Sequence, residues 1–386
     1  MNRKKAFLLN SFSGLLRQLI SLICGFVMTK LILDFYGSSM NGLVSSITQF
    51  LGFISFLEMG IGPVIQSNLY RPLAEKKDVD ISKIIKSSET FFKRIVYIFM
   101  VYIGILCVLF PILINSEFAP FFTASLVLII SLSSLAQYYF GMTYQLLLNA
   151  DQKGYVQSTL QWVTLVVNTV LCIVLMNLGA SIHIVRLITA TVYVFRPLFL
   201  NVYVKKHYNI DKNVNYNDDP IKQKWNGFAQ HLAAVVVDNT DIAVLTIMSS
   251  LQNVSVYVIY FNVVYGITQI IMTVVSGLEA MWGNMLAKKE WSIVRDSFSL
   301  MEWGIHTIVT IIFAASAFVL IYTSGIEDAN YNQPLFGVIL VFAFAMQCIR
   351  VPYFRLIKAA GHYKQTQNGA FISMVLNILI SIIIVK

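Results

Sequence analysis

Eleven apolar stretches fill almost the whole chain, and this feature limits the possible folds more than any other. A helix needs about 20 consecutive apolar residues to cross the hydrocarbon core of a bilayer. Of the 386 residues, 57% are hydrophobic and only 12% are charged, which is too few charges for the surface of a soluble protein of this size. We therefore expect an all-α polytopic membrane protein. The expected spans are residues 11–35, 42–66, 95–114, 121–148, 155–177, 182–204, 226–248, 254–278, 304–323, 334–354 and 367–385.

Lysine and arginine occur in alternate connectors, and this asymmetry predicts the topology. Of 28 basic residues, 22 lie in six segments, and the connectors between those segments hold none. Because basic loops stay on the cytoplasmic side of a membrane, we expect the N-terminus and the basic loops in the cytoplasm. Membrane topology then accounts for the formal charge of +9, and we expect no nucleic acid partner. The basic segments are residues 3–5, 71–94, 153, 205–224, 288–295 and 355–364, and the connectors without basic residues are 37–40, 115–119, 177–180, 249–253 and 324–333.

The longest polar stretch, residues 207–224, divides the chain into two weakly similar halves. Asn10-Ser-Phe12 opens the first expected span, and Asn226-Gly-Phe228 opens the seventh at an offset of 216 residues. Since six spans precede the linker, the second half would start from the same side, and the repeats would be parallel. We expect one lobe over 1–206, a cytoplasmic linker over 207–224 and a second lobe over 225–386. These would form two parallel six-helix-type bundles around a central cavity, with the last helix of the second bundle missing.

Two basic stretches have the pattern of amphipathic helices that lie in the membrane interface. In residues 81–93, isoleucines and phenylalanines share one face and lysines oppose it. In residues 291–301, Trp291, Val294, Phe298 and Met301 form a similar apolar face beside Arg295.

Several diffuse motifs are spread along nearly the whole chain. They are Asn10-Ser-Phe12, Phe35-Tyr36-Gly37 with Asn41-Gly42-Leu43, Leu57-Glu58-Met59-Gly60-Ile61-Gly62 with Leu69-Tyr70 and Leu73-Ala74, Arg196-Pro197 with Tyr203-Val204-Lys205-Lys206-His207-Tyr208, and the stretch Arg350 to Lys364 with Ala360-Gly361. Together they resemble the motifs of Wzx-type flippases, in the polysaccharide transporter branch of the multidrug/oligosaccharidyl-lipid/polysaccharide (MOP) superfamily.

The resemblance implies two six-helix bundles that move polyprenyl-diphosphate-linked oligosaccharides from the inner to the outer leaflet of a bacterial inner membrane. It also implies polysaccharide polymerase and chain-length machinery as partners, in O-antigen lipopolysaccharide, capsule or other exopolysaccharide pathways. Eleven spans depart from the twelve or more usual in that family.

The sequence contains no pattern for nucleotide hydrolysis or covalent chemistry. There is no GxxxxGK[ST] loop, so an ion gradient, the substrate gradient or a partner would have to supply energy. The five histidines are scattered, and the four cysteines lie in apolar spans without a CxxC pair, where they read as small buried hydrophobes. We expect no enzymatic activity, no cofactor and no metal centre.

Four arginines inside the expected spans are the candidate anion-binding groups: Arg17, Arg186, Arg196 and Arg350. A charge costs a few kcal/mol near the bilayer centre, so each should face protein or water. On the sixth span His183, Arg186, Tyr193 and Arg196 share one helix face. Because a guanidinium offers bidentate donors to phosphate oxygens, we expect these arginines to line the cavity and bind a diphosphate. The alternative is that each arginine snorkels to the interface or pairs with a helix carboxylate.

Three carboxylates are the candidates for coupling to protons or sodium ions. Asp238 and Asp241 are three residues apart in the seventh span, where two carboxylates on one face can share a proton or hold a cation. Salt bridges to cavity arginines are the alternative. Glu58 precedes Gly60-Ile61-Gly62-Pro63, a sequence that should loosen or kink the second span. In the fourth span, Tyr138-Tyr139-Phe140 and Tyr144 could stack on sugars.

These observations favour a flippase for lipid-linked oligosaccharides that works by alternating access. One alternative is a multidrug exporter of organic cations from the same superfamily, against which the deep arginines argue. A membrane polysaccharide polymerase or glycosyltransferase is another, but the outside connectors are too short for a catalytic loop. A non-transporting assembly scaffold is a further alternative.

Overall fold

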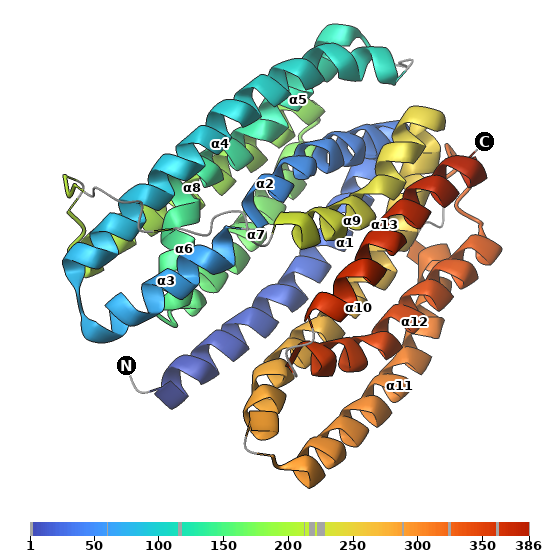
Figure 1. Ribbon diagram of the computed structural model, residues 1–386. Helices are drawn as coiled ribbons and strands as arrows, with labels where there is room; N and C mark the ends of the chain where they lie inside the picture. Colours follow the sequence, from blue (N-terminus) through green and yellow to red (C-terminus); the bar gives the residue numbers. More distant parts are fainter. Residues whose placement is uncertain are drawn as a thin grey trace. The chain divides into compact units, whose positions relative to one another are not determined.

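All regular secondary structure in the described part of the chain is helical (Figure 1). This computed structural model describes residues 3–385 apart from 60, 115–117, 212, 216–220, 222–227, 288, 323–325 and 360–362. Six stretches in this part are long and apolar enough to cross a membrane: Leu8–Ser55, Asp78–Leu113, Pro120–Ala150, Gly154–Asn177, Ile182–His207 and Pro334–Ile357. The first of them contains the expected span 11–35 and the start of the expected span 42–66. The expectation of an all-α, multi-pass membrane protein is confirmed.

The chain separates into two compact units. Unit 1 comprises Met1–Leu31, Ser46–Met248 and Ile380–Lys386, and unit 2 comprises Ile32–Ser45 and Ser249–Leu379. The lobe boundaries expected at residues 207–224, and the central cavity between lobes, stay predictions. The helices are α1 (Arg3–Gly52), α2 (Phe56–Met59), α3 (Gly62–Glu75), α4 (Asp78–Leu113), α5 (Pro120–Ala136), α6 (Met142–Ala150), α7 (Gly154–Asn177), α8 (Ile182–His207), α9 (Phe228–Met248), α10 (Leu251–Ala287), α11 (Trp291–Tyr322), α12 (Pro334–Ala359) and α13 (Tyr363–Val385), with a 3₁₀ turn η1 (Phe53–Ser55) and a π-helical turn η2 (Gln137–Gly141).

Helix α1 contains the first expected span and the start of the second. A single residue separates them, Gly37, whose backbone has φ 82° and ψ 174°. These angles interrupt the helix and are much less costly for glycine than for a residue with a Cβ. The outside turn expected over residues 37–40 is therefore shortened to one position.

The second span breaks where the sequence predicted it. After α1 the chain passes through η1 and the four-residue helix α2. A longer helix begins again at α3, with Pro63 in its first turn. Proline fits there because the first turn of a helix needs no backbone N–H donor. Glu58 thus lies in a short helix that follows the 3₁₀ turn η1 and precedes α3.

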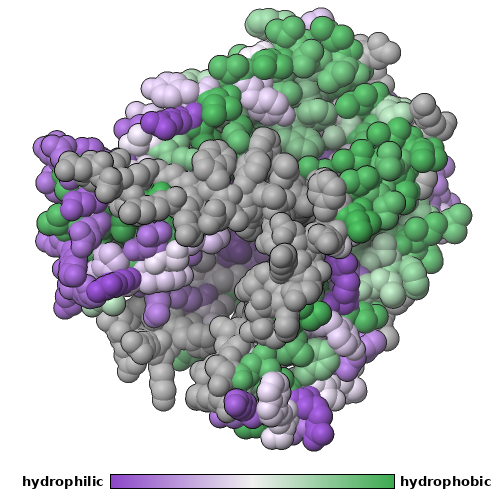
Figure 2. Space-filling model, viewed as in Figure 1, coloured by the Kyte–Doolittle hydropathy of each residue, from purple (hydrophilic) through white to green (hydrophobic). Residues whose placement is uncertain are grey.

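Helix α4 corrects the prediction of a separate interfacial helix over residues 81–93. That stretch continues directly into the third span, and Ile81, Ile84, Ile85 and Phe92 are buried in the protein. Figure 2 shows hydrophilic side chains at the α3–α4 end of unit 1 and hydrophobic ones toward the other end of α4. A helix of 36 residues is about 54 Å long at 1.5 Å per residue, which exceeds a hydrocarbon core of about 30 Å. The first part of α4 therefore extends beyond the span and packs on protein.

The second predicted interfacial stretch is likewise the first part of a longer helix, α11. Val294 is buried, whereas Trp291 remains exposed. This apolar face is therefore only partly covered.

The Asn10 motif has a structural role in unit 1. The Asn10 side chain donates to the carbonyl of Gln152 (2.8 Å) and accepts from the backbone N–H of Tyr155 (2.6 Å). Ser13 adds a bond to the Tyr155 carbonyl (3.2 Å). The first turns of α1 are thereby joined to the α6–α7 connection.

A second polar cluster surrounds the same connection. Asp151 pairs with Lys153 at 2.7 Å and accepts from the Tyr208 hydroxyl at 2.5 Å. Burial and then the Asp151 carboxylate raise the pKa of Tyr208, so its hydroxyl remains a donor at neutral pH.

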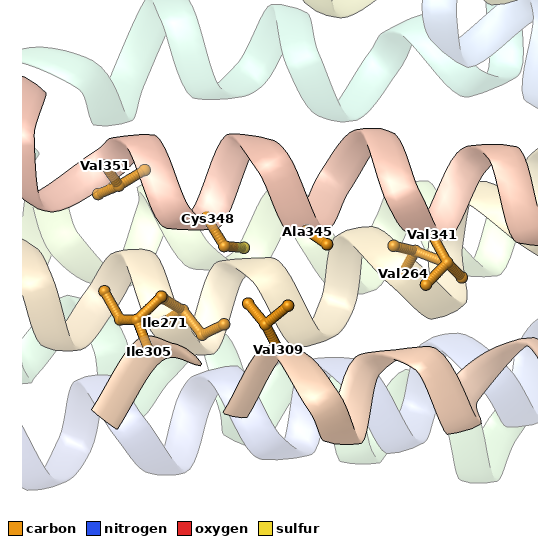
Figure 3. Close-up of a cluster of buried hydrophobic side chains, with 8 residues drawn as sticks. All are labelled: Val264, Ile271, Ile305, Val309, Val341, Ala345, Cys348 and Val351. Atoms are coloured by element: carbon orange, nitrogen blue, oxygen red, sulfur yellow. The ribbon is translucent and has the colours of Figure 1, made fainter. Parts of the chain in front are cut away.

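The core of unit 2 is formed by three long helices (Figure 3). Residues at helical spacing on α12 meet residues of α10 and α11, and most of them are aliphatic. Cys348 is fully buried in this cluster, as expected for a small hydrophobe. The cluster comprises Val264, Ile271, Ile305, Val309, Val341, Ala345, Cys348 and Val351.

Candidate functional site

Unit 1 contains a polar cavity of 310 Å³, called cavity 1 here, between α5, η2, α6, α7 and α8. Its volume is at the lower end of the range of about 300–1,000 Å³ that is usual for ligand pockets. Its apolar lining is small: Met142, Leu160 and Leu200. The polar lining consists of Gln137, Gln145, Gln157, Gln161, Ser133, Ser134, Tyr138, Tyr193 and Arg196.

Cavity 2, of 330 Å³, lies in the same unit and shares a wall with cavity 1. Four residues line both cavities: Ser133, Ser134, Tyr138 and Tyr193. Hydroxyl groups and Arg186 supply most of the remaining polar surface of cavity 2. The residues lining it besides the shared four are Thr48, Leu51, Gly52, Ile54, Ser55, Ile130, Arg186, Thr189 and Ala190.

Arg196 is held firmly in the wall of cavity 1. Its Nε donates to the Thr164 hydroxyl, and one Nη donates to the Gln161 carbonyl at 3.3 Å. Its guanidinium lies 3.8 Å from the centre of the Tyr193 ring, in cation–π geometry. Helix α8 thus carries Tyr193 and Arg196 one turn apart and fixes them against α7.

The shared wall includes a π-helical turn between α5 and α6. In η2 the extra residue per turn places Tyr138 against both cavities, and its side chain is 7% exposed. A Cβ on Gly141 would lie 2.8 Å from the Cβ of Pro197, so glycine permits the close approach of η2 to α8. Such turns are often found at functional sites.

Glu58 lies beside this wall. Its carboxylate is partly buried and interacts with the Tyr138 side chain. Among the described residues that line the two cavities, none is an aspartate or glutamate. The polar surface of the cavities is therefore neutral and cationic, with one carboxylate behind Tyr138.

Two of the four predicted arginines, Arg186 and Arg196, line these cavities, and the other two do not. Arg17 is partly buried in α1 and is absent from the lining of both. Arg350 belongs to unit 2, where it is exposed with its guanidinium 5.9 Å from the Phe354 ring centre. His183, on the predicted face of α8, hydrogen-bonds Ser125 at 2.9 Å and packs on α5. Anion binding by any of the four arginines stays a prediction.

The predicted acidic pair lies in α9. Asp241 accepts a hydrogen bond from Ser381 of α13 at 3.2 Å. The side chain of Asp238 lies outside the described part of the chain. Coupling by either residue stays a prediction.

One of the four predicted sugar-stacking aromatics lines cavities 1 and 2, namely Tyr138. Tyr144 is 3% exposed and donates to Glu89 at 2.8 Å, and Tyr139 and Phe140 are partly exposed beside an apolar pocket. Adjacent positions of one helix point in different directions, so the four could not share one site.

The four glutamines of cavity 1 are not among the residues predicted from the sequence. Gln157 and Gln161 are four residues apart in an expected span, and Gln137 donates to Gln145 at 2.9 Å. An amide inside an apolar span is costly unless it meets polar groups, so these positions carried a usable signal.

Comparisons with known proteins show the fold. No protein-family model matches the chain, and no curated protein matches it in sequence. The eukaryotic MATE transporter AtDTX14 matches with a TM-score of 0.62 and 10% identity, over 98% of this chain and 93% of that one. A MOP superfamily transporter from Pyrococcus furiosus, described by the reverse polarity of its binding pocket, matches with a TM-score of 0.59 and 14% identity, over 99% and 94%. The MATE multidrug transporter DinF-BH matches with a TM-score of 0.57 and 13% identity, over 99% and 95%.

At these identities the similarity concerns the three-dimensional fold. It extends over nearly the full length of each chain and shows that this chain shares the fold of those transporters. The expected Wzx-type branch stays a prediction. The chain is a multi-pass membrane protein with the fold of MATE transporters of the MOP superfamily.

Proposed function

We propose that the protein is a transporter that carries polyprenyl-diphosphate-linked oligosaccharides from the inner to the outer leaflet by alternating access. The observation that carries this proposal is the lining of cavities 1 and 2: two arginines, four glutamines and many hydroxyls, with no carboxylate among the described lining residues. The transporter fold is consistent with it.

The substrate needs such a lining because its head group cannot cross hydrocarbon bare. Diphosphate oxygens accept hydrogen bonds, and a guanidinium provides donors that match them. Sugar hydroxyls both donate and accept, as do glutamine amides and protein hydroxyls. The polyprenyl chain is apolar and would remain in the lipid during translocation.

The proposal includes ion coupling through Glu58, with the aspartates of α9 as further candidates. Glu58 is placed to respond to the state of the cavity wall because it interacts with Tyr138, which lines both cavities. A carboxylate in such a position can bind a proton or sodium ion and change the wall when it does so. The proposed location is a bacterial inner membrane, with the N-terminus in the cytoplasm.

Export of organic cations is the second candidate. It is favoured by the fold, since the structures similar to this chain include the MATE multidrug transporter DinF-BH. The positive charge of the described lining favours the anionic substrate. A cation would meet Arg186 and Arg196 without a neutralising carboxylate in the lining.

Proteoliposomes distinguish the two candidates. The purified protein would be reconstituted with a fluorescent polyprenyl-diphosphate-linked glycan in the inner leaflet or with an organic cation dye in the lumen. The proposal requires faster glycan-lipid crossing with wild-type protein than with empty liposomes, and slower crossing with Arg196→Gln. Dye efflux without glycan-lipid crossing would establish the second candidate instead.

A further inference from the structure

Cavities 1 and 2 differ in the chemistry of their unshared walls. Amide side chains are concentrated in cavity 1, where Gln157 and Gln161 project from α7 and Gln137 and Gln145 from η2 and α6. Cavity 2 has no amide in its described lining and presents Arg186 with the hydroxyls of Thr48, Ser55 and Thr189. The two walls therefore suit different parts of a ligand.

Cavity 1 is matched to groups that both donate and accept hydrogen bonds. Each glutamine amide has a carbonyl that accepts and an NH₂ that donates, as a sugar hydroxyl requires. A phosphate oxygen only accepts, so it would leave the carbonyls unsatisfied or face them at close range. Two Arg196 donors are directed at the Thr164 hydroxyl and at the backbone carbonyl of Gln161, so this side chain supports the part of α7 that carries the amides.

Cavity 2 is matched to a group that only accepts hydrogen bonds. The Arg186 guanidinium carries donors and no acceptor, and the Thr48 and Ser55 hydroxyls lie in the same lining. The Thr189 hydroxyl donates to the Val185 carbonyl at 3.0 Å, and no described carboxylate lines the cavity. The shared wall, with Tyr138 and Tyr193, lies between the two environments. One ligand with a polar head in two parts could therefore occupy both cavities.

We infer that the head group is divided between the two cavities: Arg186 and the hydroxyls of cavity 2 bind the diphosphate, and the glutamines of cavity 1 bind the first sugar. This inference rests on the proposed function and assigns its substrate contacts. It makes cavity 1 the determinant of glycan specificity and leaves the contribution of cavity 2 independent of the glycan.

Binding of lipid probes to the protein in nanodiscs tests whether the head group is divided between the two cavities. Three lipid probes would be compared, namely polyprenyl monophosphate, polyprenyl diphosphate and polyprenyl-diphosphate-linked N-acetylglucosamine. Arg186→Gln should weaken both diphosphate probes by the same factor, about tenfold or more, because a charge-assisted hydrogen bond is lost in each complex. Gln157→Met and Gln161→Met should each weaken only the glycan-bearing probe, by about fivefold, because each removes a neutral hydrogen bond.

The controls separate failure of the inference from failure of the proposed function. Gln66→Met on α3 and Arg295→Gln on α11 change the same residue types outside both cavities and should leave all three affinities unchanged. Inorganic pyrophosphate added to wild type should compete weakly if the site is built for a lipid head group, and as well as the lipid if it serves a free anion.

Each outcome has one meaning. If wild type binds no diphosphate lipid better than the monophosphate, the proposed function is wrong. A second result would contradict only the division of the head group. In this result wild type binds the diphosphate lipids, but the glutamine variants lose affinity for both diphosphate probes equally, or Arg186→Gln keeps its affinity for them. The proposed transport function would not be contradicted by it. For each glutamine variant the comparison is between probes on one folded protein. A general loss of stability would weaken binding of all the probes and would not imitate a loss confined to the glycan-bearing one.

Discussion

Asp328 accepts hydrogen bonds from the backbone N–H of Ser38 at 2.5 Å and from its hydroxyl at 2.6 Å, directly after the break at Gly37. The Ser38 hydroxyl also meets that of Tyr331 at 2.5 Å, which in turn meets Ser255 at 3.0 Å. A carboxylate here binds an otherwise unsatisfied donor at the start of a helical segment, as an N-cap does. The loop before α12 thereby fixes the restart of α1 in unit 2.

Asp328→Asn should destabilise unit 2 by about 1–2 kcal/mol, because the amide accepts less strongly and turns a donor toward Ser38. Thermal unfolding of the purified protein, followed by circular dichroism, measures the effect. Glu327→Gln removes the neighbouring exposed carboxylate and should leave the midpoint unchanged. Equal midpoints for both variants and wild type would contradict the capping role.

Glu58→Gln should remove the response of transport to an imposed proton or sodium gradient, because the amide cannot exchange a proton or carry charge beside Tyr138. We expect gradient-driven transport to fall about tenfold or more, in line with coupling free energies of a few kcal/mol. Transport in proteoliposomes with and without each gradient is the measurement. Asp296→Asn, an exposed carboxylate on α11, is the matched control. Gradient-dependent transport that persists in Glu58→Gln would assign coupling to another residue.

At the scale of helices, close approach between α1 and α10 within unit 2 depends on Gly42. A Cβ at this position would lie 1.9 Å from the Leu251 carbonyl oxygen, which belongs to the backbone and cannot rotate away. Asn41 adds a buried hydrogen bond to Ser255 of α10 at 2.8 Å. Small residues at helix contacts of membrane proteins commonly permit this approach.

Gly42→Ala should therefore cost about 1–3 kcal/mol of stability, as overpacked sites do. Gly25→Ala is the matched control in the same helix, since nothing lies within 4 Å of the Cβ that it adds. That control should be neutral or stabilising by up to about 1 kcal/mol, because alanine favours helix. Urea or thermal unfolding of both variants measures the difference, and an unaffected Gly42→Ala would mean that the two helices can separate without loss.

At the scale of the whole molecule, the charge pattern predicts the orientation in the membrane. Asn253 and Asn209 are both exposed and lie in connectors expected on opposite sides. With Asn253→Cys, a membrane-impermeant maleimide should label intact cells; with Asn209→Cys, it should label only permeabilised cells, because basic loops remain in the cytoplasm. The four native cysteines lie in helices, and the unmodified protein gives the background. The reverse labelling pattern would show that the topology is opposite to the predicted one.

The class of the protein and the break at Glu58–Pro63 could be read from the sequence, because both follow from short-range terms. Transfer of each side chain from water to lipid contributes nearly independently, so about twenty apolar neighbours suffice to predict a span. Proline and glycine act on their own backbone and that of their neighbours. The same local rules gave a wrong prediction for residues 81–93, namely a separate interfacial helix. The sequence pattern of an apolar stripe is the same whether lipid or another helix covers it.

The sequence by itself determined that the chain is helical, that it enters a membrane and that charged side chains occur within its spans. The tertiary structure decided which of those side chains meet. Arg186 and Arg196 line cavities with the glutamines, whereas Arg17 and Arg350 do not line them, although all four look alike in an apolar span. The physical reason is that hydropathy depends on what a residue is, while a binding site depends on which helix face packs against which neighbour. The π-helical turn at Tyr138 and the close contact of Gly141 with Pro197 fix that packing in unit 1.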